Sequence, residues 1–221
     1  MASTSKLAAF TKFGKKIVCA GRNYAEHAAE LNNPVLTTPL LFMKPPSCYL
    51  ANGGTIEIPV GSSEVHHEIE LGVVIGSTIT RASPTEAFAA IGGYALVLDM
   101  TLREKQSELK KKGHPWELAK CFDTSLPVSE FIPITSIPDP HQIDLICKVN
   151  GDVKQHDSTS KMITRIPEML SYISKYFTLE EGDLVITGTP KGVGPVKSGD
   201  TISGEIPGIT QFSFSVAQRS L

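Results

Sequence analysis

Short β-rich segments, separated by Gly, Pro, Asn and Asp, constrain this chain more than any other feature of its sequence. Their β-branched and aromatic residues favour strands, and the residues between them favour turns. The predicted strands cover residues 16–21, 40–45, 55–60, 66–76, 92–100, 144–155, 183–190 and 211–217. Because they do not alternate regularly with helical segments, the doubly wound and (β/α)8 barrel folds are disfavoured.

Few helices are expected among these strands. The predicted helices are 23–31, 102–112 and 166–177. Their signals are Asn23 as a candidate N-cap, Gly113 directly after the second helix, and Pro167 near the start of the third. Asn150 and Gly151 divide the strand segment 144–155 and predict a hairpin, since both residues tolerate positive φ. Without a linker or repeat, we expect one α+β domain over residues 1–221.

Composition excludes several classes of protein. Of 221 residues, 41% are hydrophobic and 20% are charged, which is typical of a globular protein. The net charge of −2 shows no electrostatic footprint for nucleic acid or an anionic membrane, and no apolar run is long enough to span a bilayer. The four cysteines form no C-x-x-C pair, which favours free thiols in a reducing compartment. A small molecule is therefore the expected partner.

Residues 1–15 differ from the rest of the chain. They contain Lys6, Lys12 and Lys15 and several hydroxyl residues, and no acid precedes Glu26. This composition is compatible with a mitochondrial targeting segment. Because the segment lacks arginine, a flexible basic tail on a cytoplasmic protein is the alternative.

Glu68 and Glu70 share one face of the predicted strand 66–76 and adjoin an apolar run. Neighbouring buried carboxylates need a proton or a cation. Asp99 ends the next apolar strand and could join them, so the three acids predict a site for Mg²⁺ or Mn²⁺. Two simpler interpretations are a solvated sheet edge for the glutamates and a helix N-cap for Asp99.

Other residues suit catalysis only in combination. Lys120 lies in the turn-rich segment 115–127, where its charge could reach an enolate or a carboxylate, although many such lysines only extend to solvent. His27 and Glu30 stand three residues apart on one helix face and could act as a base and the carboxylate that orients it. A surface pair without chemistry is the alternative.

Further groups could bind a carboxylate or a keto oxygen. They are Arg22, Tyr24, Arg103 and Gln106, each of which could equally be a surface residue. The loop 187–195 is rich in glycine but matches neither the P-loop nor the dinucleotide fingerprint. We expect its N–H groups and the Thr189 hydroxyl to hold a small carboxylate, or the loop to be a tight structural turn. The lysines at 110–112 are interpreted as complementing the dipole of the preceding helix.

Together these segments resemble one family. "GRNYAEHAAEL", "LLFMKP", "HHEIELGVVIG", "GGYALVLDMT", "PWELAKCFDTSLP" and "TGTPKGVGP", in this order, are similar to the fumarylacetoacetate hydrolase superfamily, above all to its mitochondrial acylpyruvase and oxaloacetate decarboxylase members. The resemblance implies a mixed β-roll with few peripheral helices that forms a homodimer. It assigns the metal to Glu68, Glu70 and Asp99, and catalysis to Lys120 and to His27 and Glu30 on a mobile lid. The positions expected to border the substrate are Arg22, Lys44, Arg103, Gln106 and Thr189.

The implied chemistry is that of a small α-keto acid bound to Mg²⁺ or Mn²⁺. Hydrolysis of an acylpyruvate, decarboxylation of oxaloacetate and keto–enol tautomerisation of oxaloacetate all involve related enolates, and the sequence does not rank them. Two alternatives remain open. One is an isomerase or decarboxylase of the dicarboxylates of aromatic catabolism, and the other is a metal-binding module without turnover.

Overall fold

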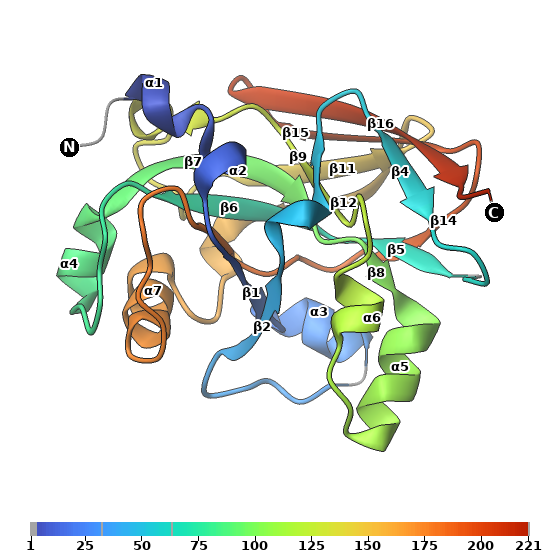
Figure 1. Ribbon diagram of the computed structural model, residues 1–221, viewed down its shortest axis with the longest axis horizontal. Helices are drawn as coiled ribbons and strands as arrows, with labels where there is room; N and C mark the ends of the chain where they lie inside the picture. Colours follow the sequence, from blue (N-terminus) through green and yellow to red (C-terminus); the bar gives the residue numbers. More distant parts are fainter. Residues whose placement is uncertain (1–3, 32, 63, 221) are drawn as a thin grey trace.

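The computed structural model describes residues 4–31, 33–62 and 64–220, which form three β-sheets with short helices around them (Figure 1). The largest sheet has the order β2-β1-β13-β6-β7-β9-β3, and β10 also pairs with β7. Its strands are β1 Ile17–Gly21, β2 Leu40–Lys44, β3 Tyr49–Ala51, β6 Ile69–Ile75, β7 Ile91–Leu98, β9 Leu126–Val128, β10 Ile132–Pro133 and β13 Leu184–Ile186. Parallel and antiparallel pairs both occur, since β1 is parallel to β13 and antiparallel to β2.

Two smaller sheets complete the fold. The second sheet contains β4 Thr55–Ile58, β11 Asp144–Val149, β12 Asp152–Ser158, β15 Thr201–Ile206 and β16 Thr210–Gln218, and the third contains β5 Val65–His67, β8 Thr101–Leu102 and β14 Gly194–Val196. β11 and β12 form the predicted hairpin, with φ of 53° at Asn150 and 88° at Gly151. The mixed β fold with few helices is confirmed.

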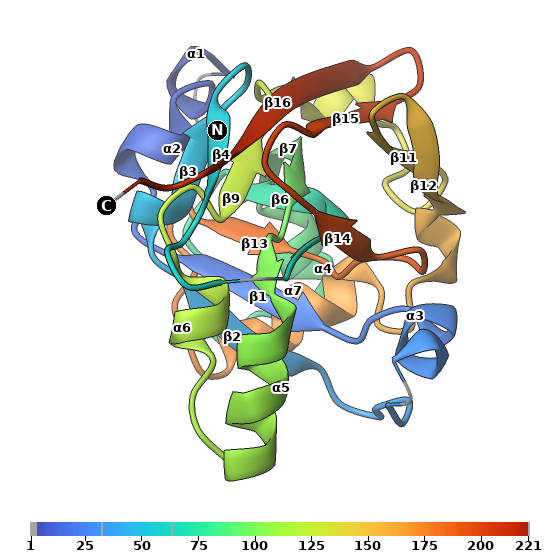
Figure 2. The same cartoon turned by 90° about the vertical axis from the view of Figure 1, so that its right-hand side faces the viewer.

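The helices are short. They are α1 Thr4–Leu7, α2 Phe10–Phe13, α3 Ala25–Glu30, α4 Pro84–Ala89, α5 Arg103–Lys112, α6 Glu117–Lys120 and α7 Ile166–Ser174, with 3-10 turns at Pro46–Cys48, Ile134–Ser136 and Thr159–Lys161. Gly113 ends α5 in a left-handed conformation, as predicted. In both views α3, α5 and α6 lie at the lower end of the molecule, away from β15 and β16 (Figures 1 and 2). No described helix is long and apolar enough to cross a membrane.

Several short elements escaped prediction. Strands of two or three residues, such as β8 and β10, are too short to show a period of two. β15 was missed for another reason, because Gly204 interrupts it and turn-rich sequence precedes it. A Cβ at Gly204 would lie 2.6 Å from the ring of Phe212, so this glycine makes room for an aromatic side chain on the neighbouring strand.

The predicted strand 66–76 is two strands in the structure. β5 pairs with β14 and β8, whereas β6 pairs with β13 and β7, so the chain passes from one sheet to another at Glu68. Every residue of β6, including Glu70, is buried, and so is Glu68. A solvated sheet edge for the two glutamates is therefore wrong.

The N-terminal segment is packed where the structure describes it. Leu7 and Phe10 are buried in a cluster with residues of β1 and β13, and Lys15 pairs with Glu180 at 2.5 Å. Residues 1–3 lie outside the described part. The described residues of the segment 1–15 therefore do not form a flexible tail. Its role as a targeting segment stays a prediction.

Candidate active site

Three carboxylates lie together where β6 begins and β7 ends. Glu68 precedes β6, Glu70 is its second residue, and Asp99 follows β7. In this antiparallel pair Ile69 lies opposite Leu98, which sets Glu68 beside Asp99, and the Asp99 N–H donates to the Glu68 carbonyl at 2.8 Å. Glu68, Glu70 and Asp99 are 5%, 2% and 1% exposed. One oxygen from each lies within 4.8 Å of the others. Sheet register thus builds the predicted acidic cluster, and Asp99 does not cap α5, whose N-cap is Leu102.

Protein cations surround two of the three acids. Lys120 Nζ lies 2.6 Å from Asp99 Oδ2 and 3.0 Å from Glu68 Oε2, and it donates to Thr101 Oγ1 at 2.6 Å. Lys44 Nζ lies 2.9 Å from Asp99 Oδ1, and Arg103 forms an ion pair with Glu68. Among the described residues Glu70 has no such cationic partner and accepts only the Gly188 N–H, at 2.6 Å.

The pKa shifts follow this unequal distribution. Burial alone would raise the pKa of Glu68, but the charges of Lys120 and Arg103 outweigh it and hold that pKa below its usual value. Burial, together with the charges of Asp99 and Glu68, raises the pKa of Glu70 well above its usual value. The cluster is therefore short of positive charge at Glu70.

The donor set fits a hard divalent cation. Asp99 Oδ1 is buried, and among the described residues its only partner is the Lys44 ammonium, at 2.9 Å. The ionised form of Glu70 is disfavoured unless a further cation binds beside it. Carboxylate oxygens at this spacing, facing a cavity, suit Mg²⁺ or Mn²⁺.

His27 and Glu30 form a pair at the edge of the same cavity. His27 is buried and lines the cavity, and its Nδ1 lies 3.2 Å from Glu30 Oε2. Glu30 also accepts the Gly192 N–H at 3.0 Å. A carboxylate that accepts from Nδ1–H leaves Nε2 of the ring free to accept a proton. The geometry thus matches a base and the group that orients it.

The helix α3 that carries this pair depends on contacts from other segments. Asn23 does not cap it, because the N-cap is Tyr24 and no side chain caps the helix there. Asn23 instead joins two distant segments: its Nδ2 donates to the Thr164 and Thr187 carbonyls and its Oδ1 accepts the Thr164 N–H. The prediction of a capping role for Asn23 is therefore wrong.

The glycine-rich loop 187–195 has a role different from the predicted one. Its Gly188 and Gly192 N–H groups already bind the chain's own carboxylates, on Glu70 and Glu30. Thr189 Oγ1 donates to the Ile69 carbonyl at 2.8 Å and accepts from Gln155 Nε2 at 2.8 Å. The loop therefore holds side chains of the candidate site in place, and in this structure the N–H groups of Gly188 and Gly192 and the Thr189 hydroxyl hydrogen are already used.

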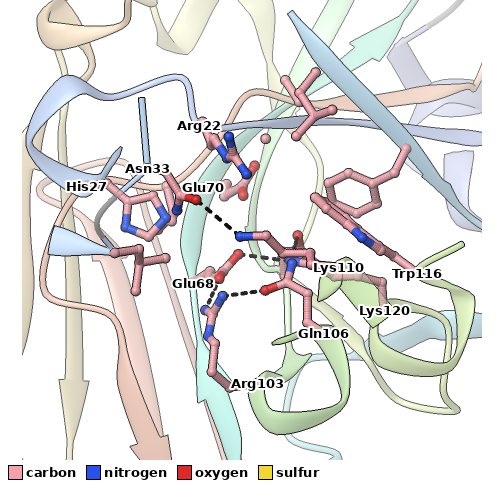
Figure 3. Close-up of a pocket in the computed structure, with 17 residues that line it drawn as sticks. Arg22, His27, Asn33, Glu68, Glu70, Arg103, Gln106, Lys110, Trp116 and Lys120 are labelled. Atoms are coloured by element: carbon pink, nitrogen blue, oxygen red, sulfur yellow. Dashed lines mark hydrogen bonds and ion pairs between the residues drawn. The ribbon is translucent and has the colours of Figure 1, made fainter. Parts of the chain in front are cut away.

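Most of the predicted substrate positions line the cavity. Arg22, Arg103, Gln106 and Thr189 do so together with His27, Lys120 and the three acids (Figure 3). Lys44 does not. It is fully buried behind Asp99, where its ammonium also donates to the Ser125 carbonyl at 3.1 Å. A direct contact of Lys44 with substrate stays a prediction, while its pairing with Asp99 gives it a positioning role.

Sequence reasoning missed part of the cavity wall. The helix dipole is the only role that the sequence indicates for Lys110, but its Nζ reaches across to Asn33 Oδ1 at 3.1 Å. Lys110 follows Arg103 by seven residues and Gln106 by four, which places the three on one face of the helix. This spacing was the sequence signal that could have placed Lys110 at the cavity. Leu31, Leu40, Phe42 and Trp116 supply the apolar part of the wall, and they leave a cavity of only about 50 Å³.

The family follows from comparison with known proteins. The model for the C-terminal domain of fumarylacetoacetate (FAA) hydrolase matches residues 16–217. The chain belongs to the fumarylacetoacetate hydrolase family. Oxaloacetate tautomerase FAHD1 of Homo sapiens, described as mitochondrial, is 50% identical over 216 residues that cover 98% of both chains.

Other members of the fumarylacetoacetate hydrolase family agree. The mitochondrial oxaloacetate decarboxylase of Dictyostelium discoideum is 47% identical over 212 residues, covering 95% of this chain and 97% of that protein. The fumarylpyruvate hydrolase of Pseudomonas aeruginosa, solved with Mn²⁺ and pyruvate, superposes with a TM-score of 0.87 at 34% identity, covering 93% of this chain and 91% of the other. The predicted family is confirmed, and with it the prediction of an enzyme.

Proposed function

We propose that this enzyme binds Mg²⁺ or Mn²⁺ at Glu68, Glu70 and Asp99 and acts on oxaloacetate, as a keto–enol tautomerase and decarboxylase. The observation that carries the proposal is the buried acidic cluster, short of one cation, in a small cavity that also holds a His–Glu pair and a lysine. The names of the human and Dictyostelium relatives support oxaloacetate, and their location supports a mitochondrial protein.

The bound cation would supply Lewis-acid polarisation of substrate carboxylate and keto oxygens. The chain's own residues do the rest. Lys120, an ammonium fixed between Asp99 and Glu68, adds positive charge beside the oxygen at which the enolate charge develops. Lys44 pairs with the other oxygen of Asp99 and so fixes the orientation of that carboxylate.

Proton transfer falls to His27. With Nδ1 directed at Glu30, its Nε2 can take a proton from C3 of the keto form and deliver it to the C2 oxygen, which gives the enol, and the reverse transfer restores the keto form. Decarboxylation needs no such base, because loss of CO2 gives the enolate directly. The tautomerase activity should therefore depend on His27 far more than the decarboxylase activity does.

Acylpyruvate hydrolysis is the second candidate. The His27–Glu30 pair could equally activate water, and the Pseudomonas aeruginosa relative is a fumarylpyruvate hydrolase. The ring pair of Phe42 and Trp116, 5.8 Å apart, stands between the small cavity and a larger apolar hollow lined also by Met43 and Phe177. A longer acyl chain would have to displace this wall, and so would the dicarboxylates of the isomerase alternative.

The test uses metal-stripped protein supplied with Mg²⁺ or Mn²⁺. Enol decay and CO2 release are followed separately with oxaloacetate, and C–C cleavage with acetylpyruvate. We expect all activity to depend on the metal, and kcat/KM to be higher for enol decay than for CO2 release or for cleavage of acetylpyruvate. Higher kcat/KM on acetylpyruvate would favour the hydrolase, and binding of metal without turnover of either substrate would favour the non-catalytic module. The predicted homodimer is checked on the same sample by its mass in solution.

A further inference from the structure

Two cations in the cavity lack an anionic partner in the part of the chain that the structure describes. Lys120 and Arg103 are paired with the acidic cluster. Arg22 makes no hydrogen bond or ion pair with any residue that the structure describes, and Lys110 contacts only the neutral amide oxygen of Asn33. Figure 3 shows Lys110 extending from α5 toward Asn33, with Arg22 reaching into the same space from the segment after β1.

This arrangement brings like charges together at the cavity. Although Lys110 is largely exposed, partial desolvation and the nearby charges of Arg22 and Arg103 lower its pKa. Arg22 is also held at a φ of 58°, a left-handed conformation that non-glycine residues rarely adopt and that is common at functional sites. Neither feature stabilises the fold, and both are explained by a ligand that brings negative charge.

We propose that Arg22 and Lys110 together bind the second carboxylate of a dicarboxylic α-keto acid, the one remote from the acidic cluster. The inference rests on the proposed function and refines its substrate class. One carboxylate and the keto oxygen of the substrate face Glu68, Glu70 and Asp99. The other carboxylate enters the space between the guanidinium and the ammonium, where charge-assisted hydrogen bonds are strong.

Asn33 gives this pair its selectivity. As an amide it fixes the position of the Lys110 ammonium without neutralising it. An aspartate at the same position would form an ion pair with Lys110 and compete with the substrate carboxylate. A substrate with a single carboxylate would leave Arg22 and Lys110 facing each other uncompensated, so the cavity discriminates against monoanions.

The test compares Lys110→Met with Lys111→Met in the metal-loaded enzyme, on oxaloacetate and on acetylpyruvate, which has one carboxylate. Lys111 is the matched control, because it is exposed on the same helix and does not line this cavity. For Lys110→Met we expect KM for oxaloacetate to rise roughly ten- to hundred-fold, the range of a lost charged hydrogen bond, and KM for acetylpyruvate to change less than about two-fold. Asn33→Asp should raise KM for oxaloacetate alone by a smaller factor.

A binding measurement separates failure of this inference from failure of the proposed function. Calorimetry with Mg²⁺ present compares malate, which has two carboxylates, with lactate, which has one. Wild-type protein should bind malate more tightly, and Lys110→Met should remove the difference. If wild-type protein turns over neither keto acid but keeps this preference, the proposed function fails and the anion site stands. Equal effects of Lys110→Met on both substrates, or no preference for malate, would overturn the inference.

Discussion

The acidic cluster and the His27–Glu30 pair face one cavity but are held in place by different means. Glu68 and Asp99 are fixed by the register of two buried strands, and all three acids are nearly inaccessible to solvent. The His–Glu pair stands on α3, a helix of six residues, which is too short to be stable by itself. Its contacts include exposed ion pairs of Glu26 with Lys161 and Lys191, at 3.0 and 2.5 Å. The cluster is thus part of the core, whereas the helix of the His27–Glu30 pair is held partly by weak surface interactions.

The largest effect is expected from Asp99→Asn. The amide keeps the shape of the carboxylate but loses a charge that both Lys120 and the metal need, so turnover of oxaloacetate should fall by about 10³-fold. Calorimetry with Mn²⁺ should show a matching loss of metal affinity, while circular dichroism confirms the fold. Full activity at saturating Mg²⁺ would remove Asp99 from the metal site.

Lys120→Met tests the same buried cluster from its cationic side. Removing the ammonium should lower kcat by roughly 10²-fold. It also leaves Glu68 and Asp99 with less positive charge, so saturating Mg²⁺ should raise Tm more in the variant than in the wild type. A smaller rise in Tm would mean that the metal does not bind beside Lys120.

His27→Gln tests the His27–Glu30 pair on α3. Enol decay should slow by about 10²-fold because the proton acceptor is gone, with decarboxylation changing less than about two-fold. Glu30→Gln keeps a hydrogen-bond acceptor for Nδ1–H, so its rate of enol decay should lie between those of His27→Gln and the wild type. If both reactions slow equally, α3 contributes to substrate binding rather than to proton transfer.

The smallest effect is expected from Glu26→Gln, which weakens the docking of α3. Hydrogen bonds from Lys191 and Lys161 hold the pKa of Glu26 at about 2, below its ordinary 4.5. The contribution of these bonds is present above pH 4.5 and is lost as the pH falls from 4.5 toward 2. Protection factors of the α3 amides, taken relative to the intrinsic exchange rate at each pH, should fall over that range in the wild type. In the variant they should be lower at pH 4.5 and change less. Identical profiles would show that these ion pairs do not hold α3.

The same contrast explains what could be predicted from the sequence. Glu68, Glu70 and Asp99 follow from strand periodicity and strand ends, which are local properties. The position of Lys44 depends on the order of β2, β1 and β13 in the sheet, and no local pattern encodes that order. Asn23 looked like a cap because caps are the commonest use of asparagine before a helix, whereas its partners Thr164 and Thr187 are distant in sequence.

Lys110 shows a different limit. Its helix face could be derived from its spacing to Arg103 and Gln106, but three consecutive lysines at the end of a helix have a simpler explanation in the helix dipole. Only the position of Asn33 on the other side of the cavity distinguishes Lys110 from its two neighbours. Charge runs at helix ends therefore need three-dimensional context before one member can be assigned to a site.

The ion pairs of Lys120, Lys44 and Arg103 with the acidic cluster bear on how the protein folds in the absence of metal. Small zinc domains cannot fold before their metal arrives, because nothing else neutralises their ligands. Here the chain carries its own counter-ions in the site. Folding should therefore not depend on the proposed metal, and we expect a chelator to abolish activity reversibly without exposing the protein to proteolysis.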